Sequence, residues 1–284
     1  MNASNASNSA LAHRLTDTEV NAFRRDGFVV PAYRLTDDLV TAMRAATVDL
    51  MAAYPKMPTE GLVSPHIRYA DTQRPDIHDR FLDFCQVPEL LDVVEQLIGP
   101  DIITWGSRIF SKAARTGRAT PWHQDGEYWP IRPLATVTAW IAIDNCTPEN
   151  GCLKLVAGSH RDKRLLEHRS LAGQGAALDK EITPGAFNEN DVVEVPLGPG
   201  QMVLFDVYTA HGATPNTSPE RRAGFAIRYM PGTSLYDRSM KVGSGQDDVQ
   251  TDLSQRALFL LRGEDKTGAN DFEIGHDGMV VEVA

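Results

Sequence analysis

Three residues in the sequence have the types and the spacing of a metal site. His123 and Asp125 are separated by a single residue, and His211 follows 88 residues after His123. Two imidazoles and one carboxylate on one face of a ferrous ion leave the opposite face open, which is the ligand set of non-haem Fe(II) oxygenases. A strand would place His123 and Asp125 on the same side, because strand side chains alternate with a period of two. The alternative interpretation of this pair is a surface histidine and aspartate that flank a turn.

The composition limits the class of protein and its partners. The chain has 284 residues, 42% of them hydrophobic, and we expect a single domain over 1–284. Its formal net charge of −10 argues against nucleic acid and acidic membrane surfaces as partners. Three cysteines without a C-x-x-C pair favour a reducing compartment. Residues 1–14 predict a polar disordered tail, and no apolar run approaches the length of a membrane span, so we expect a cytoplasmic protein.

The first hundred residues predict helices, and the rest of the chain predicts short strands. Capping and helix-breaking residues indicate a helix from Thr16 to Arg25, a buried strand at 28–30, and helices from Thr36 to about Ala53 and from Pro88 to Ile98. Further strands are expected at 101–112, 137–144, 152–156, 201–205 and 223–229. The polar segment 158–192 predicts a long loop with one short helix, and long loops are often lids. The pattern predicts a helix at 247–261 and a strand in the last segment.

The order of these elements indicates the fold class. Helices followed by many short strands, without βαβ alternation, argue against a Rossmann fold. The better match is a mainly β fold with flanking helices, in which an antiparallel double-sheet barrel holds a ligand cavity between its sheets.

A series of short motifs, each weak alone, is specific in its order and spacing. The motifs lie at 26–28, 121–125, 140–144, 149–153, 158–160, 199–205, 211–212, 215–216 and 221–222. Together they make the chain resemble the phytanoyl-CoA dioxygenase family of Fe(II)/2-oxoglutarate-dependent oxygenases, from about Asp17 to about Pro231. The resemblance implies a double-stranded β-helix (jelly-roll, cupin-like) barrel. It also implies oxidative decarboxylation of 2-oxoglutarate coupled to hydroxylation of a substrate.

The resemblance assigns roles to residues around the metal. His123, Asp125 and His211 would be the iron ligands, and the presence of Asp125 favours hydroxylation or a related oxidation, because halogenating relatives lack this carboxylate. Arg222, eleven residues past His211, stands where the family holds the distal carboxylate of 2-oxoglutarate, and a guanidinium binds a carboxylate bidentately. The alternative for Arg222 is a surface arginine beside Glu220.

One position departs from the family pattern. Many members have a serine two residues after the distal histidine, where its hydroxyl assists the same carboxylate of 2-oxoglutarate. This chain has Ala213 there, so Thr214 or another group would have to supply the hydrogen bond.

Other side chains are expected to line the cavity. Trp140 stands where the family lines the cosubstrate pocket, although it could equally be an ordinary core aromatic, and Thr138 shares its strand face. The expected cosubstrate contacts are Arg222, Trp140, Thr138 and Arg108. The expected substrate contacts are Arg108, Lys112, Tyr128, Trp129, Arg228 and, more weakly, Arg68.

The cations among these residues suggest an anionic substrate. An unpaired buried charge is costly, so several inward cations favour a substrate that carries a carboxylate or phosphonate, with internal salt bridges as the alternative. We therefore expect Fe(II), 2-oxoglutarate and O2 to act on a small metabolite, with release of succinate and CO2. Desaturation, epimerisation or ring closure by the same cofactors stays open, as does a non-catalytic jelly-roll binding protein. The sequence does not indicate the oligomeric state.

Overall fold

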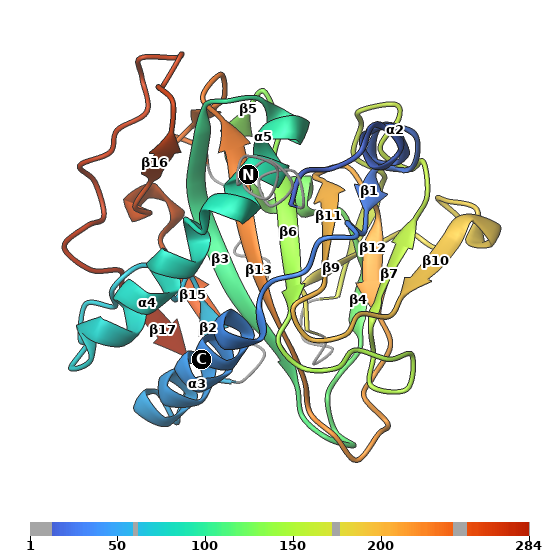
Figure 1. Cartoon of the computed structure of the whole chain (residues 1–284), viewed down its shortest axis with the longest axis horizontal. Coiled ribbons are helices and arrows are strands. Elements are labelled where there is room, and N and C mark those ends of the chain that lie inside the picture. The colour runs from blue at the N-terminus through green and yellow to red at the C-terminus, as the bar shows by residue number, and fades with distance from the viewer. Residues whose placement is uncertain (1–12, 59–61, 172–176, 241–248, 284) are drawn as a thin grey trace, which may run out of the picture.

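Two antiparallel sheets form the centre of the fold. The computed structural model describes residues 13–58, 62–171, 177–240 and 249–283 (Figure 1). The larger sheet has the strand order β1-β11-β6-β13-β3-β16, with β2 paired to β3, and the smaller sheet has the order β10-β7-β12-β4. The larger sheet consists of β1 (Phe28–Val29), β2 (Leu62–Val63), β3 (Ile102–Lys112), β6 (Val137–Ala142), β11 (Met202–Asp206), β13 (Arg222–Pro231) and β16 (Phe259–Arg262). The smaller sheet consists of β4 (Thr120–His123), β7 (Leu153–Val156), β10 (Val192–Val195) and β12 (His211–Ala213). The predicted mainly β jelly-roll with flanking helices is thereby confirmed.

Shorter elements connect and flank the two sheets. Three small two-stranded sheets pair β5 (Ile131–Arg132) with β14 (Leu235–Tyr236), β8 (His168–Ser170) with β9 (Lys180–Ile182), and β15 (Val249–Thr251) with β17 (Val281–Val283). Single 3-10 turns occur at η1 (Asp125–Tyr128), η2 (Glu189–Asp191) and η3 (Leu253–Gln255).

Two of the four helices in the described ranges begin at a capping threonine, and the other two have a proline in their first turn. The four helices are α2 (Asp17–Asp26), α3 (Asp37–Ala53), α4 (Pro75–Cys85) and α5 (Pro88–Ile98). Thr16 and Glu19 form the predicted capping box, and Thr36 accepts a hydrogen bond from Leu39 N. The sequence analysis did not predict α4. Its cap residue, Arg74, makes no side-chain capping bond, and its available start signal was Pro75 in the first turn, of the same kind as Pro88 in α5.

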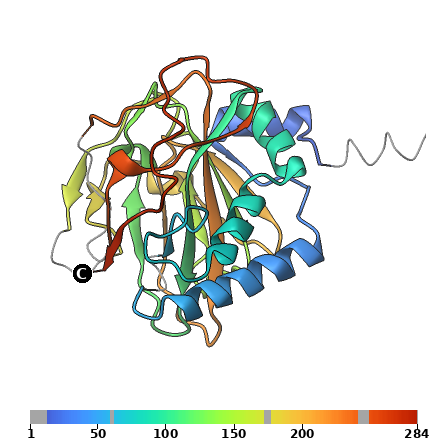
Figure 2. The ribbon, with the colours of Figure 1, turned by 90° about the vertical axis from the view of Figure 1, so that its left-hand side faces the viewer.

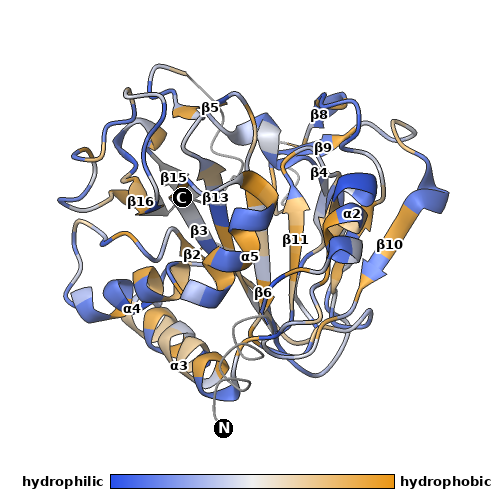
Figure 3. Ribbon diagram, turned by 45° about the horizontal axis from the view of Figure 1, so that its top comes forward, coloured by the Kyte–Doolittle hydropathy of each residue, from blue (hydrophilic) through white to orange (hydrophobic). Residues whose placement is uncertain are grey.

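Alternation along the strands separates a packed face from a functional face. On β13, Phe225 and Ile227 belong to the hydrophobic core that also contains buried residues of α3, α4 and α5. Figure 2 shows these helices on one side of the larger sheet, and Figure 3 shows hydrophobic and hydrophilic residues alternating along α3 and α5. The intervening residues of β13, such as Arg222 and Arg228, line cavities between the sheets. The helices thus hold the outer face of the sheet in place, and its inner face is left for polar chemistry.

Three expectations about segments need correction or restriction. The helix predicted at 247–261 is wrong in the part that the structure describes, because residues 249–251 and 259–262 are strands and β16 pairs with β3 at the edge of the larger sheet. Pairing with the edge of the sheet has outweighed the helical propensity of this segment. The strand predicted in the last segment is confirmed as β17. Residues 247–248 lie outside the described residues.

The two remaining segments contain more structure than expected. The predicted loop 158–192 includes a hairpin of β8 and β9 that was not predicted. The short helix expected in this segment is the 3-10 turn η2. Residues 172–176 lie outside the described residues. Of the predicted tail 1–14, residues 1–12 lie outside the described residues, whereas His13 Nε2 lies at hydrogen-bond distance, 2.7 Å, from Asp92 Oδ2. Within the described ranges, no helix combines the length and the hydrophobicity that crossing a membrane requires.

Candidate metal centre and its cavities

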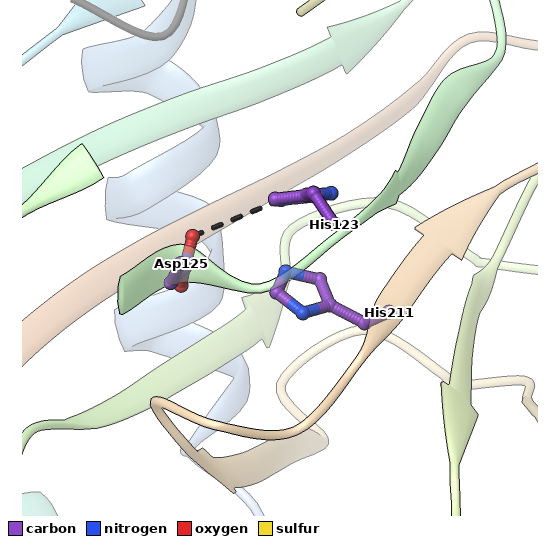
Figure 4. A group of neighbouring side chains, drawn as sticks. All are labelled: His123, Asp125 and His211. Atoms are coloured by element: carbon purple, nitrogen blue, oxygen red, sulfur yellow. Dashed lines mark ion pairs between the residues drawn. The ribbon is translucent and has the colours of Figure 1, made fainter. Parts of the chain in front are cut away.

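Three side chains from distant segments meet between the sheets. His123 ends β4, Asp125 begins η1, and His211 begins β12 (Figure 4). Each of these three buried residues, called the triad below, offers a ligand atom, and the three atoms lie within 4.8 Å of one another. His123 Nε2 is 3.7 Å from Asp125 Oδ1, and the two imidazole centroids are 4.1 Å apart. The alternative of a surface pair that flanks a turn is therefore wrong.

The backbone brings the triad together in a different way from the one predicted. The strand ends at His123, so Asp125 does not share a strand face with it but lies in the first turn of η1. His211 is the direct register partner of His123 across β4 and β12. Pairing of these two strands, and not the period of one strand, therefore places the imidazoles next to each other, with their planes tilted by 52°.

Hydrogen bonds prepare all three ligands for a metal. Nδ1 of His123 lies 2.8 Å from Pro121 O, and Nδ1 of His211 lies 2.9 Å from Thr209 O. Because a carbonyl only accepts, both Nδ1 atoms must donate, which leaves the Nε2 lone pairs free. Thr138 Oγ1 donates to Asp125 Oδ2 at 3.3 Å and leaves Oδ1 on the side of His123.

Electrostatics favour the neutral form of a triad histidine. Burial, together with the neighbouring His211, lowers the pKa of His123 well below its ordinary value. Metal ligation needs neutral imidazole and ionised carboxylate, and two imidazoles with one carboxylate suit Fe(II). The donor set therefore fits a non-haem iron centre.

A cavity of about 420 Å³, the Arg222 cavity below, opens beside the triad. Besides the triad, its lining includes Thr120, Thr138, Trp140, Ala213, Arg222 and Arg228. Arg222 is 2% exposed, its guanidinium carbon stands 5.4 Å from the centroid of the Trp140 ring, and Nη1 donates to Phe110 O at 3.3 Å. The alternative of a surface arginine beside Glu220 is wrong, because Arg222 is buried in the cavity wall.

A larger cavity of about 670 Å³, the Arg256 cavity below, also reaches the triad. Its lining includes His123, Asp125, Arg108, Arg228 and Arg256, together with the aromatic residues Trp105, Phe110, Tyr128 and Trp129. The guanidinium carbon of Arg108 lies 4.6 Å from the Phe110 ring centroid, and that of Arg228 lies 5.1 Å from the Trp129 ring centroid. Arg228 lines both cavities, so it stands at the boundary between them.

Two predicted residues lie elsewhere. Lys112 lines a smaller cavity of about 330 Å³ next to Arg222, where its ammonium donates to Arg118 O. The side chain of Arg68 is 54% exposed and forms a bidentate salt bridge with Asp79, with N–O distances of 2.9–3.0 Å. The structure thus gathers the other predicted site residues around the Arg222 and Arg256 cavities, whereas Lys112 lines the neighbouring small cavity and Arg68 lies at the surface.

Sequence reasoning missed a residue that lies between two of the ligands. Gln124 is fully buried, and its Nε2 donates to Tyr208 O at 2.6 Å and to Arg164 O at 3.2 Å. Its Oε1 accepts from Leu166 N at 2.6 Å, and its backbone N donates to His168 Nε2 at 3.2 Å. Gln124 therefore ties the metal motif both to the segment before His211 and to 158–192. Its position between two ligands was the available signal.

Two further cavity residues were also missed. Arg256 lies in the segment that was expected to be a helix, and nothing in its local sequence indicates that it faces the site. Thr120 is the register partner of Ala213 and lines the Arg222 cavity with it. Thr214, which was considered as a replacement for the missing serine, is half-buried, does not line the Arg222 cavity, and donates its hydroxyl to Pro148 O at 3.4 Å.

Comparisons with known proteins agree with this geometry. The phytanoyl-CoA dioxygenase family matches residues 23–224. Human peroxisomal phytanoyl-CoA dioxygenase is 27% identical over 193 residues, which cover 66% of this chain and 56% of the human protein. Ectoine dioxygenase from Sphingopyxis alaskensis is 26% identical over 232 residues, 73% of each chain. The chain spans 57%, 56% and 49% of the lengths of relatives from Dictyostelium discoideum, Homo sapiens and Caenorhabditis elegans.

Solved structures share the fold. The non-heme monooxygenase ThoJ superposes with a TM-score of 0.66 at 27% identity and covers 89% of this chain and 86% of its own. The non-heme alpha-ketoglutarate-dependent carbocyclase SnoK superposes with a TM-score of 0.63 at 25% identity, covering 79% of this chain and 87% of its own. With the family match over most of its length and the triad in place, the chain belongs to the phytanoyl-CoA dioxygenase family of Fe(II)/2-oxoglutarate-dependent oxygenases.

Proposed function

We propose that this protein is a Fe(II)- and 2-oxoglutarate-dependent dioxygenase that hydroxylates a small anionic metabolite. The observation that carries the proposal is that His123 and Asp125 border two cavities at once, one lined by Arg222 and the other by Arg256, with Arg228 in the lining of both. When bound, iron and 2-oxoglutarate supply the oxidation: O2 gives one oxygen atom to 2-oxoglutarate, which leaves as succinate and CO2, and the other to a substrate C–H bond, which becomes C–OH. The cofactors do the oxidation, and the protein positions the reactants and excludes water.

Arg222 would hold the far carboxylate of 2-oxoglutarate. It is buried on the inner face of β13, and Trp140 beneath its guanidinium limits the directions in which it can move. A guanidinium in this position can take a carboxylate through two parallel N–H donors. We assign the hydroxyl that Ala213 lacks to Thr120, because Thr120 faces Ala213 across the β4–β12 pair in the same cavity.

The segment 158–192 would act as the lid of a single oxygenase domain. Leu178 lines both the Arg256 cavity and the small cavity beside Arg222. Lys180 pairs with Glu127 at 2.6 Å, two residues from Asp125, and its carbonyl accepts a hydrogen bond from Tyr128 at 3.4 Å. A cover tied to the metal motif in this way would exclude water from the reacting atoms.

The test is spectroscopic and chemical. Anaerobic addition of Fe(II) and 2-oxoglutarate to the purified protein should produce a weak visible charge-transfer band, which His123→Ala should abolish. Succinate release should depend on both additions. A folded, iron-loaded protein that shows neither the band nor succinate release would overturn the proposal.

A second reaction type deserves a direct measurement. SnoK, which shares this fold, is described as a carbocyclase, so ring closure, desaturation or epimerisation by the same cofactors is the competing proposal. The mass of the product separates these reactions, because hydroxylation adds one oxygen atom to the substrate and the others do not.

A further inference from the structure

Two residues that line the Arg256 cavity carry hydrogen-bond donors that lack acceptors in the part of the chain that the structure describes. Within the described ranges, Arg228 Nε and Trp105 Nε1 are both buried and have no hydrogen-bond partner. Both residues line this cavity. A buried donor without a partner is costly, so two such donors in one cavity favour a ligand that brings oxygen acceptors.

The charges in this cavity call for an anion. Among the described residues that line it, Asp125 is the one carboxylate. The charge of Asp125 favours the ionised form of Arg228, whereas burial and the neighbouring Arg256 lower the pKa of that guanidinium. When Asp125 binds a metal ion, its negative charge is shared with that ion. Arg228 then needs a different anion close by.

Arg256 adds a second guanidinium at the same place. A Cβ built on Gly106, the register partner of Arg228, would lie 3.6 Å from Arg256 Nη1 and 3.7 Å from Arg228 Nη1. The two side chains therefore approach each other above a residue that has no side chain of its own. Arg256 is held there by a hydrogen bond to Ser64 Oγ. Two like charges this close repel each other, and an oxyanion bound between them offsets that repulsion.

Apolar and aromatic side chains also line this cavity, next to its charged groups. The guanidinium carbon of Arg228 stands 5.7 Å from the Trp105 ring centroid and 5.1 Å from that of Trp129, so two indole faces flank the charged end. Leu178 and Leu253 also line the cavity. A ligand that fits this lining has a hydrophobic body and one anionic end.

We infer that Arg228, Arg256 and the Trp105 indole N–H form the subsite for the anionic group of the substrate, and that the substrate is an amphipathic carboxylate or phosphonate. This inference rests on the proposed function, because it assigns the Arg222 cavity to 2-oxoglutarate. It places the two anions in different cavities, both of which are lined by His123 and Asp125. Arg256 belongs only to the substrate side, which makes it the residue to test.

The test uses matched probes on protein loaded with Mn(II) and 2-oxoglutarate, so that the metal and the Arg222 cavity are already occupied. Octanoate is compared with 1-octanol, 3-phenylpropionate with 3-phenylpropan-1-ol, and phenylphosphonate with benzyl alcohol. Binding is followed by tryptophan fluorescence, because Trp105 and Trp129 border the subsite. At least one acid should bind about tenfold more tightly than its neutral partner, as expected for charge-assisted hydrogen bonds.

Variants locate the source of this preference. Arg256→Gln and Arg228→Gln should each reduce the acid preference about tenfold, and Arg256→Lys should retain part of it, because the charge remains while the planar fork is lost. Arg68→Gln, which removes an exposed arginine paired with Asp79, is the matched control and should behave as the wild type. Circular dichroism and thermal melting establish that each variant is folded.

Two results would overturn the inference. One is a wild-type protein that prefers no acid over its neutral partner, and the other is an acid preference that survives in both glutamine variants. Failure of the proposed function is a separate result, since it would show as the absence of the Fe(II)/2-oxoglutarate band in the wild type, whatever the probes do.

Discussion

Thr138 Oγ1 donates a hydrogen bond to Asp125 Oδ2 at 3.3 Å, which connects β6 of the larger sheet to the carboxylate of the triad. This bond directs the other oxygen, Oδ1, toward His123. Thr138→Val keeps the shape of the side chain and removes the donor. We expect Mn(II) or Fe(II) affinity, measured by calorimetry, to fall about 10- to 100-fold, the usual cost of losing a hydrogen bond to a metal ligand.

A matched control lies two residues away. Thr136 is also a buried threonine, and its hydroxyl has no hydrogen-bond partner within the described ranges. Thr136→Val should therefore leave metal affinity unchanged. Equal losses of affinity in both variants would mean that the Thr138 hydroxyl does not orient Asp125.

Gln124 is the residue whose loss should affect both stability and the metal site. Gln124→Leu keeps the volume but leaves the part-buried Tyr208 O and Leu166 N without their partners, at a cost of about 1–3 kcal/mol for each. We expect the free energy of unfolding in urea to fall by about 3 kcal/mol and metal affinity to fall with it.

The control for this prediction is Gln96, which makes a comparable pair of hydrogen bonds to the backbone of Leu15 far from the triad. Gln96→Leu should lower stability without changing metal affinity measured on the folded protein. If Gln124→Leu also left metal affinity intact, Gln124 would be a stabilising residue only.

The sequence located the triad because its evidence is local and chemical. No knowledge of the fold is needed to read the residue types and the spacing of His123, Asp125 and His211 from the sequence. What it could not supply was the way they meet, since that depends on the register of β4 against β12. For the same reason it missed Thr120, whose place opposite Ala213 is a property of strand pairing.

Capped helices were predictable, and the C-terminal part of the chain was not. Thr16 and Thr36 satisfy backbone N–H groups within their own helices, so the signal lies in a few consecutive residues. By contrast, β16 exists because its backbone completes the edge of β3, more than 140 residues earlier in the chain. Pairing with a strand so distant in the chain gives no signal in the local sequence. Arg256 was therefore missed together with β16, which follows it.

Thr120 should contribute to cosubstrate binding if it replaces the missing serine. Thr120→Val removes the hydroxyl in the Arg222 cavity, and we expect the KM for 2-oxoglutarate to rise about tenfold, because a hydrogen bond to a charged group contributes about 1.5–3 kcal/mol. Adding Ala213→Ser to this variant should restore part of the loss, since a hydroxyl returns to the opposite strand. A KM that stays the same in Thr120→Val would remove Thr120 from the cosubstrate site.

Gly224 makes room for Trp140. A Cβ built on Gly224 would lie 2.1 Å from the indole, so Gly224→Ala must displace Trp140 from beneath Arg222. We expect a loss of about 1–3 kcal/mol in the free energy of unfolding, as for other overpacked interiors, together with a higher KM for 2-oxoglutarate. Gly106→Ala on the neighbouring strand is the control for stability, because its Cβ would meet nothing closer than 3.5 Å. Equal stability of the two variants would show that Trp140 can move without cost.

His66 should make the stability of the metal-free protein depend on pH. It is 2% exposed, its Nδ1 lies 2.6 Å from Ser107 Oγ, and burial together with the positive charges of Arg256 and Arg228 lowers its pKa well below the ordinary value. The unfolded chain takes up a proton on this histidine near pH 6.5, whereas the folded chain does not until a much lower pH. The unfolded state therefore binds more protons below about pH 6.5, and stability is lost as the pH falls from that value.

The expected slope for one such histidine is about 1.4 kcal/mol per pH unit. Urea unfolding of the metal-free protein between pH 8 and pH 5 should show stability nearly constant above about pH 6.5 and falling below it. His66→Asn keeps a polar group near Ser107 but cannot titrate. The free energy of unfolding of this variant should therefore fall less steeply with pH, by the slope that corresponds to the uptake of about one proton. His78, which is buried and donates through Nδ1 to Pro65 O at 2.8 Å, has its pKa lowered by the same desolvation and continues to titrate in the variant. A wild-type slope retained in His66→Asn would mean that His66 accepts its proton in the folded protein as readily as in the unfolded chain.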